Sequence, residues 1–188
     1  MLQTGDLLFF RGDPNCALDK LIMTFTGSPY THVGMFIQDP SWMTLKGQFC
    51  LQSNSHKQTA VEQGDRQSGV VLTPLSEMRD YEVRHLTTIR DKKFYQKLER
   101  VHAKVHNLSY DYSALDWIRS GLYAIGLSWF ATPKHTNNFW CSALCAFVYK
   151  ELGLFDESMD WSNQSPGDLA TTEALVAPSS LSVMRDSK

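Results

Sequence analysis

The 188-residue sequence has few cysteines, no long hydrophobic run and no large excess of charge of either sign. Its four cysteines include no C-x-x-C pair and are too few for a disulfide framework in a chain of this length. Eighteen basic residues face 20 acidic ones, so no basic field attracts nucleic acid. The longest apolar run, residues 121–131, is shorter than the roughly 20 residues that cross a bilayer. We therefore expect no nucleic-acid partner and no transmembrane segment.

Several functional signatures are also missing. Residues 1–6 lack the basic and apolar regions of a secretory signal, which favours a reducing, cytoplasmic location. The sequence has no glycine-rich phosphate loop, no G-x-S-x-G and no H-E-x-x-H motif. We accordingly expect no cofactor and no resident metal.

The hydrophobic content, 43%, is enough for the core of one domain. Short apolar stretches bounded by Gly, Pro and Asp predict strands at 6–10, 32–37, 49–54, 69–75 and 81–87, with a polar loop at 55–68. Strands that follow one another without intervening helices favour antiparallel pairing. The fold class expected is α+β, with an antiparallel sheet of about five strands packed against helices.

Helical periodicity predicts four helices, and a soft tail follows them. Asp13 would cap the first, which would run to Gly27, and Asp91 would cap the second. The others are expected from 113 to before Pro133, and from a cap at Asn138 to Gly153. Residues 1–161 form the predicted domain, and 162–188 a partly ordered tail.

Cys141 is the most informative position for chemistry. With Asn138 as the cap, Cys141 is the third residue of its helix, where free N–H groups and the helix dipole favour a thiolate. The alternative is a buried structural cysteine, a role that Cys145 could share one turn later. A zinc site is a third interpretation, but Cys141, Cys145 and His135 supply only three ligands.

A thiol nucleophile needs a base, and His32 is the best placed of six histidines. It opens an apolar strand, where a rigid sheet can hold an imidazole against a helix end. His102 and His106 lie on a largely polar helix face and are expected to be solvated, while His135 follows Pro133 in a connecting segment.

Several segments, taken in order, resemble the circularly permuted papain-like cysteine hydrolases of the NlpC superfamily, of which lecithin:retinol acyltransferase is a relative. Three of them are short and lie far apart in the chain: TGDLLFF at 4–10, GSPYTHVGMFI at 27–37 and FWCSAL at 139–144. Further similarity lies at 69–75, 110–112, 148–149 and 152–154.

This resemblance implies a permuted papain-like fold in which the histidine strand precedes the cysteine helix. It assigns Cys141 as the nucleophile, His32 as the general base and Gln52 as the third, orienting residue. The third residue is often acidic in the family, so a neutral amide is a departure that cannot balance an imidazolium. The backbone N–H of Cys141 would bind the oxyanion, with Tyr30 as a second candidate donor.

The function expected is a thiol hydrolase of the peptidase or amidase type, or an acyltransferase, working through an acyl-enzyme. Its substrate would be a peptide, an acyl-amide or a lipid-like ester or thioester. Residues 118–130 are apolar and would form a core helix or touch a membrane surface, so peripheral membrane contact stays open. The alternative is a papain-like module that binds without turnover.

Overall fold

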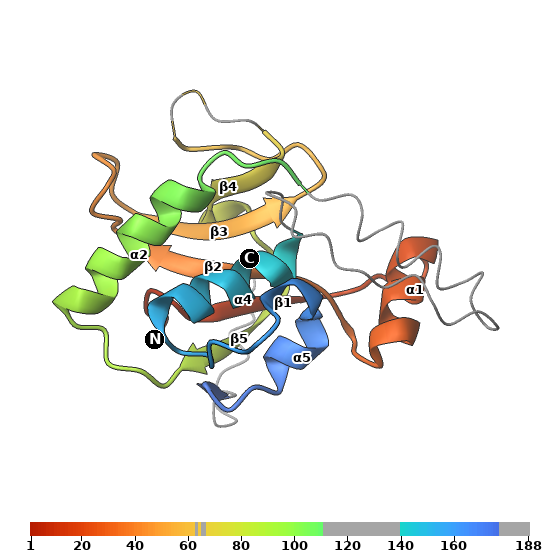
Figure 1. Cartoon of the computed structure of the whole chain (residues 1–188). Helices are drawn as coiled ribbons and strands as arrows, with labels where there is room; N and C mark the ends of the chain where they lie inside the picture. The colour runs from red at the N-terminus through yellow and green to blue at the C-terminus, as the bar shows by residue number, and fades with distance from the viewer. Residues whose placement is uncertain (63, 65–66, 111–139, 177–188) are drawn as a thin grey trace.

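The computed structural model describes residues 1–62, 64, 67–110 and 140–176, and it is an α+β structure (Figure 1). Six strands form one sheet in the order β4-β3-β2-β1-β5-β6, and each strand is antiparallel to its neighbours. Their bounds are Leu7–Arg11 (β1), Tyr30–Gln38 (β2), Gln48–Asn54 (β3), Gly69–Pro74 (β4), Tyr81–Leu86 (β5) and Leu175–Val176 (β6). The predicted class and antiparallel pairing are confirmed.

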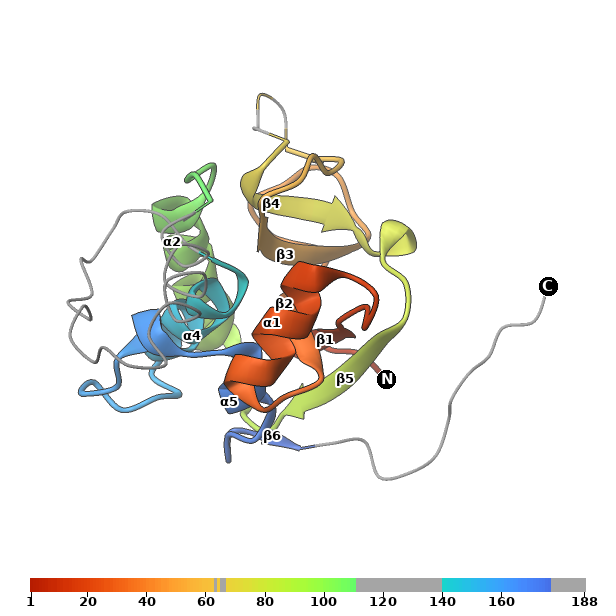
Figure 2. The same ribbon diagram turned by 90° about the vertical axis from the view of Figure 1, so that its right-hand side faces the viewer.

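Helices cover one face of the sheet. The longest described ones are α2 (Lys92–Val105) and α4 (Cys141–Leu152), which lie together on the same side of the strands (Figure 2). The shorter elements are α1 (Ala17–Thr26), α5 (Pro166–Ala170) and the 3-10 turns η1 (Leu75–Glu77) and η2 (Trp161–Asn163). Asp91 caps α2 as expected, because its side chain accepts a hydrogen bond from the Phe94 N–H at 2.8 Å.

The strands bury side chains on both faces because successive residues alternate between them. Leu7, Phe9, Val33 and Met35 face the helices and belong to the larger core. Leu8, Phe36 and Cys50 form a smaller cluster with partly buried neighbours. Full burial of a Leu or Phe side chain stabilises the fold by about 1.5–3 kcal/mol. Apolar packing therefore stabilises the sheet on both faces, mainly on the face toward the helices.

Two predicted helix starts are wrong. The first helix begins at Ala17 because the Asp13 carboxylate accepts from the Asn15 N–H at 2.8 Å and closes a local turn instead of capping a helix. The cysteine helix begins at Cys141, with Trp140 at its N-cap. The predicted cap Asn138 and the helix predicted from residue 113 lie outside the described residues.

The region predicted as a tail contributes to the fold up to residue 176. Ser165 and Asp168 form a capping box that starts α5, and Leu169 of that helix is fully buried. The two residues of β6 pair with β5, and residues 177–188 lie outside the described part. Within the described residues, no helix has the length and apolar character needed to cross a membrane.

Candidate active site

Cys141 is the first residue of α4, and its side chain is buried with 8% exposure. The N–H groups of a first helical turn have no intrahelical partner, and the helix dipole makes that end positive. The backbone N–H groups of Val33 and Ser142 donate to the Cys141 sulfur. Cys141 is thus the first residue of the helix and not the third, as predicted. At this position the free N–H groups and the helix dipole stabilise a thiolate more strongly.

His32 reaches Cys141 because β2 is open on one side at its beginning. β2 pairs with β3 only from Met35, opposite Leu51, to its end. Upstream of Met35, the backbone of β2 is therefore available to the start of α4, where the Val33 N–H meets the thiol. The His32 side chain hydrogen-bonds Cys141 from the same short stretch.

Gln52 completes the predicted set from β3. Its Oε1 lies 2.7 Å from Nε2 of His32, and the side chain is 1% exposed. Gly34 makes room for this contact: a Cβ there would lie 2.3 Å from Cys50 Sγ and 3.3 Å from Gln52 Cβ. The structure thus brings Cys141, His32 and Gln52 together in one hydrogen-bonded series.

Charge within this series favours a thiolate facing an imidazolium. Burial raises the pKa of Cys141, but the His32 charge, its hydrogen bond and two backbone N–H donors outweigh burial and lower the pKa from its ordinary value. Burial lowers the pKa of His32, but the Cys141 charge and hydrogen bonds to Cys141 and Gln52 raise it overall. Each group therefore stabilises the charged form of the other.

The other three cysteines have no such partner in the described structure, where all four are free thiols. Burial raises the pKa of Cys50 to about 12. Burial also raises the pKa of Cys145, with the nearby Cys141 and Cys50 adding to the effect. Cys16 is exposed and lies at the N-cap of α1. Reactivity near neutral pH is thus expected at Cys141 above all.

The predicted solvation of His102 is wrong. Its ring is 6% exposed, stacks on Trp42 at a centroid distance of 4.5 Å, and places Nε2 3.1 Å from Glu62. His106 lies on the same side of α2, with its ring centroid 5.2 Å from that of His102. These histidines hold the segment before β4 onto α2, away from Cys141, and His135 lies outside the described residues.

The Tyr30 hydroxyl is engaged away from a substrate oxygen. It donates to Glu82 at 2.6 Å and accepts from Arg84 at 2.9 Å. Burial and the Glu82 hydrogen bond raise the pKa of Tyr30, against the opposing effect of Arg84. Its proton is therefore committed to Glu82, and the backbone N–H of Cys141 is the stronger candidate for the oxyanion.

Sequence reasoning missed Thr73, which touches the site from β4. Its side chain is fully buried, and its Oγ1 accepts from Gln52 Nε2 at 3.0 Å. The sequence held a signal for it, because Thr73 is the polar residue in an otherwise apolar strand. A hydroxyl buried in a sheet must find a hydrogen-bond partner.

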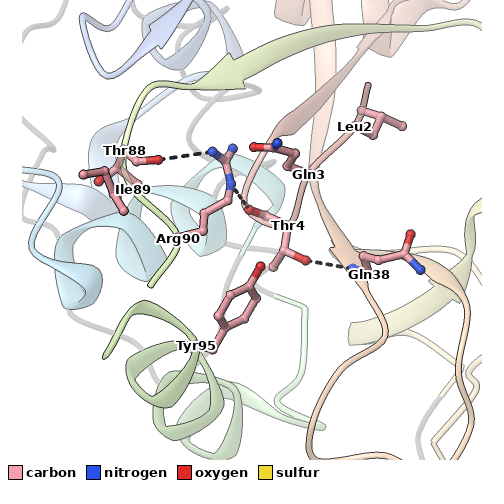
Figure 3. A pocket seen from close by; sticks show the side chains of 8 residues that line it. All are labelled: Leu2, Gln3, Thr4, Gln38, Thr88, Ile89, Arg90 and Tyr95. Carbon is pink, nitrogen blue, oxygen red and sulfur yellow. Dashed lines mark hydrogen bonds between the residues drawn. The ribbon is translucent and has the colours of Figure 1, made fainter. Parts of the chain in front are cut away.

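A pocket of about 510 Å³ lies apart from Cys141 and contains none of the predicted site residues (Figure 3). Arg90 is one of its lining residues: Nε donates to the Thr4 carbonyl at 2.7 Å and Nη1 to the Thr88 carbonyl at 3.2 Å. The Thr4 hydroxyl accepts from the Gln38 N–H at 2.9 Å. Its polar groups thus serve mainly to join the N-terminal segment to the chain before α2.

Comparison with known proteins supports the fold but does not test the chemistry of the site. No protein-family model matches the chain, and no curated protein matches it. Among solved structures, the metalloprotein yiiX from Escherichia coli O157:H7 is similar, with a TM-score of 0.52 and 22% sequence identity. The alignment covers 89% of this chain and 78% of yiiX. At this identity, the likeness concerns the fold alone.

Proposed function

We propose that this protein is a cysteine hydrolase of the amidase or peptidase type, or an acyltransferase, that acts on an amide, ester or thioester. One observation carries the proposal: the thiol of Cys141 at the start of α4 hydrogen-bonds His32, whose Nε2 lies 2.7 Å from Gln52. Nucleophile, base and orienting acceptor in one series are the arrangement of a covalent acyl-transfer site.

In the proposed reaction, the Cys141 thiolate attacks the carbonyl carbon, a C–S bond forms, and the carbonyl electron pair moves onto oxygen. The free backbone N–H of Cys141 donates to this oxyanion. When the intermediate collapses, the bond to the leaving group breaks and the His32 imidazolium gives that group its proton. An acyl-thioester on Cys141 results.

Neutral His32 then takes a proton from water or another acceptor, whose oxygen, nitrogen or sulfur attacks the thioester carbonyl. Collapse of the second intermediate breaks the C–S bond and restores the thiolate and the imidazolium. Water as the acceptor gives hydrolysis, and an alcohol, amine or thiol gives acyl transfer. A peptide, an acyl-amide and a lipid-like ester all fit this chemistry, and a reducing compartment such as the cytoplasm would keep the thiol functional.

A metal-dependent function is the competing idea, because the structurally similar yiiX is described as a metalloprotein. The donors at this site are one thiol, one imidazole and an amide oxygen already bonded to that imidazole. Among the residues that the structure describes, no three His, Cys, Asp or Glu side chains are grouped to hold a metal. Catalytic zinc normally takes three protein ligands, so we derive no step through a metal.

The proposal is tested by trapping the acyl-enzyme with an activated ester such as p-nitrophenyl acetate. Intact-protein mass spectrometry should show one acetyl group, and peptide mapping should place it on Cys141. Cys141→Ser and His32→Asn should abolish or strongly slow acetylation, while Cys16→Ser, at an exposed cysteine, should leave it unchanged. Acetylation of Cys16 in preference to Cys141 would instead favour the binding module without turnover.

A further inference from the structure

Gln52 is held at both ends of its amide. On one side, Oε1 meets His32 Nε2 at 2.7 Å, and on the other, Nε2 donates to Thr73 Oγ1 at 3.0 Å. The β3–β4 register pairs Cys50 with Thr73 and Gln52 with Val71, which makes Thr73 a diagonal neighbour of Gln52 on one face of the sheet. Both side chains are at most 1% exposed, so water does not compete for these bonds.

A second group favours the same orientation of the amide. Met78 Sδ lies 4.0 Å from Gln52 Nε2, on the N–H₂ side of the amide. A hydroxyl can donate or accept, but a thioether sulfur only accepts. A rotated amide would turn its oxygen toward this sulfur, where two acceptors would face each other. Together, Thr73 and Met78 hold the nitrogen end and direct the oxygen end to His32.

The orientation of this amide decides which His32 nitrogen carries the proton in the neutral ring. A carbonyl oxygen facing Nε2 requires hydrogen on Nε2, which leaves Nδ1 as the acceptor for the Cys141 proton. The rotated amide would aim N–H₂ at Nε2 and favour hydrogen on Nδ1. That tautomer cannot take the thiol proton, and the same N–H₂ would repel an imidazolium.

We propose that Thr73 is a positioning residue of this site: by accepting from the Gln52 amide nitrogen, it keeps the amide oxygen on His32 and His32 in the tautomer that accepts from Cys141. Met78 is the weaker second acceptor. The inference rests on the proposed function, because the imidazole that it orients is the proposed base. An amide at the third position needs a neighbour that fixes which of its two ends faces the histidine. A carboxylate does not, since both of its oxygens accept.

The test is the rate of iodoacetamide alkylation at Cys141, measured from pH 5 to 9 by peptide mass spectrometry. Thr73→Val should slow alkylation near pH 6 about fivefold, the effect of one lost hydrogen bond, and move the acid limb of the profile upward. Thr73→Ser should restore the wild-type profile. Thr4→Val is the matched control, because Thr4 is also buried and its hydroxyl accepts from the Gln38 N–H.

The Gln52→Glu background separates positioning from a merely structural role. In that background, Thr73→Val should change the rate less than about twofold, because either carboxylate oxygen can meet His32. An equal loss in both backgrounds, or a Thr73→Val profile like the wild type, would overturn the positioning role. Thr73→Ala gives the same comparison if the valine variant does not fold.

Failure of the proposed function gives a different result from failure of the positioning role. If wild-type Cys141 is alkylated no faster than Cys16, or if His32→Asn leaves its rate unchanged, the hydrolase site itself is wrong. If wild-type alkylation is fast and depends on His32 while Thr73→Val has no effect, only the positioning role is wrong.

Discussion

Two histidines of the sheet each meet a buried acceptor, and the two acceptors differ in charge. His32 Nε2 lies 2.7 Å from the amide oxygen of Gln52, and His85 Nδ1 lies 2.8 Å from the carboxylate of Asp6. Asp6 is fully buried and also accepts from Arg90 Nη2 at 2.5 Å. The backbone N–H groups of residues 3 and 86 complete its hydrogen bonds.

The difference separates a network suited to stability from one suited to reactivity. Around Asp6, an arginine neutralises the carboxylate and backbone donors fill its remaining positions, so the charges balance internally. Gln52 brings no charge, so a protonated His32 draws its compensation from the Cys141 thiolate. A neutral acceptor thus leaves the histidine dependent on its nucleophile.

Removal of the Asp6 carboxylate should have the largest effect on stability. Asp6→Ala leaves the largely buried Arg90 guanidinium bonded to the Thr4 and Thr88 carbonyls but without the carboxylate that balances its charge, which should lower the free energy of unfolding by about 3–5 kcal/mol. Gln52→Ala removes a neutral hydrogen-bonded group and should cost about 1–3 kcal/mol. Urea unfolding followed by circular dichroism measures both, and equal losses would contradict the proposed division between the two networks.

Removal of His32 should have the largest effect on reactivity. His32→Asn should slow alkylation of Cys141 at pH 6 by on the order of 100-fold, because a thiol with an ordinary pKa of about 8.5 is almost wholly protonated there. His85→Asn is the matched control, since His85 also bonds a buried acceptor but does not contact Cys141. A comparable loss in both variants would show a general effect on folding.

The pH profile of alkylation should carry the signature of the coupled pair. The pKa of Cys141 is lowered, so the rate should rise through an acid limb below the range of an ordinary thiol. The pKa of His32 is raised, so the imidazolium should persist above its usual range before a second limb appears. In His32→Asn, one limb near pH 8.5 should remain. A single limb there in the wild type would contradict the ion pair.

Part of the fold and of the candidate site could be predicted from the sequence, and the rest could not be for physical reasons. The apolar strands and the Asp91 cap follow from local periodicity, whereas the pairing of His32 with Cys141 is expected from the resemblance of several ordered segments to a known family. The start of α4 did not follow, because helix ends depend on caps that several neighbouring residues can provide. Thr73 was missed because its role depends on the β3–β4 register, which no local pattern specifies.

The smallest predicted effect comes from giving the site the carboxylate that the Asp6 network already has. Gln52→Glu places a negative charge beside His32 Nε2, which should stabilise the imidazolium and raise the pKa of His32 further. The thiol lies on the far side of the ring, so the acid limb set by Cys141 should move less than the alkaline limb. The alkylation rate near pH 7 should change less than about threefold, since the lowered pKa of Cys141 rests mainly on the His32 charge that is present in both variants.

NMR titration of the His32 ring protons, in parallel with alkylation, measures the two limbs separately in this variant. Gln38→Glu, which adds the same charge at the other end of β2, is the matched control. If His32 titrates identically in the wild type and in Gln52→Glu, or if Gln38→Glu shifts it equally, residue 52 does not govern the charge of the imidazole. A selective shift at His32 would show that a neutral acceptor at residue 52 leaves the imidazolium less stabilised than a carboxylate would, and therefore readier to give its proton to a leaving group.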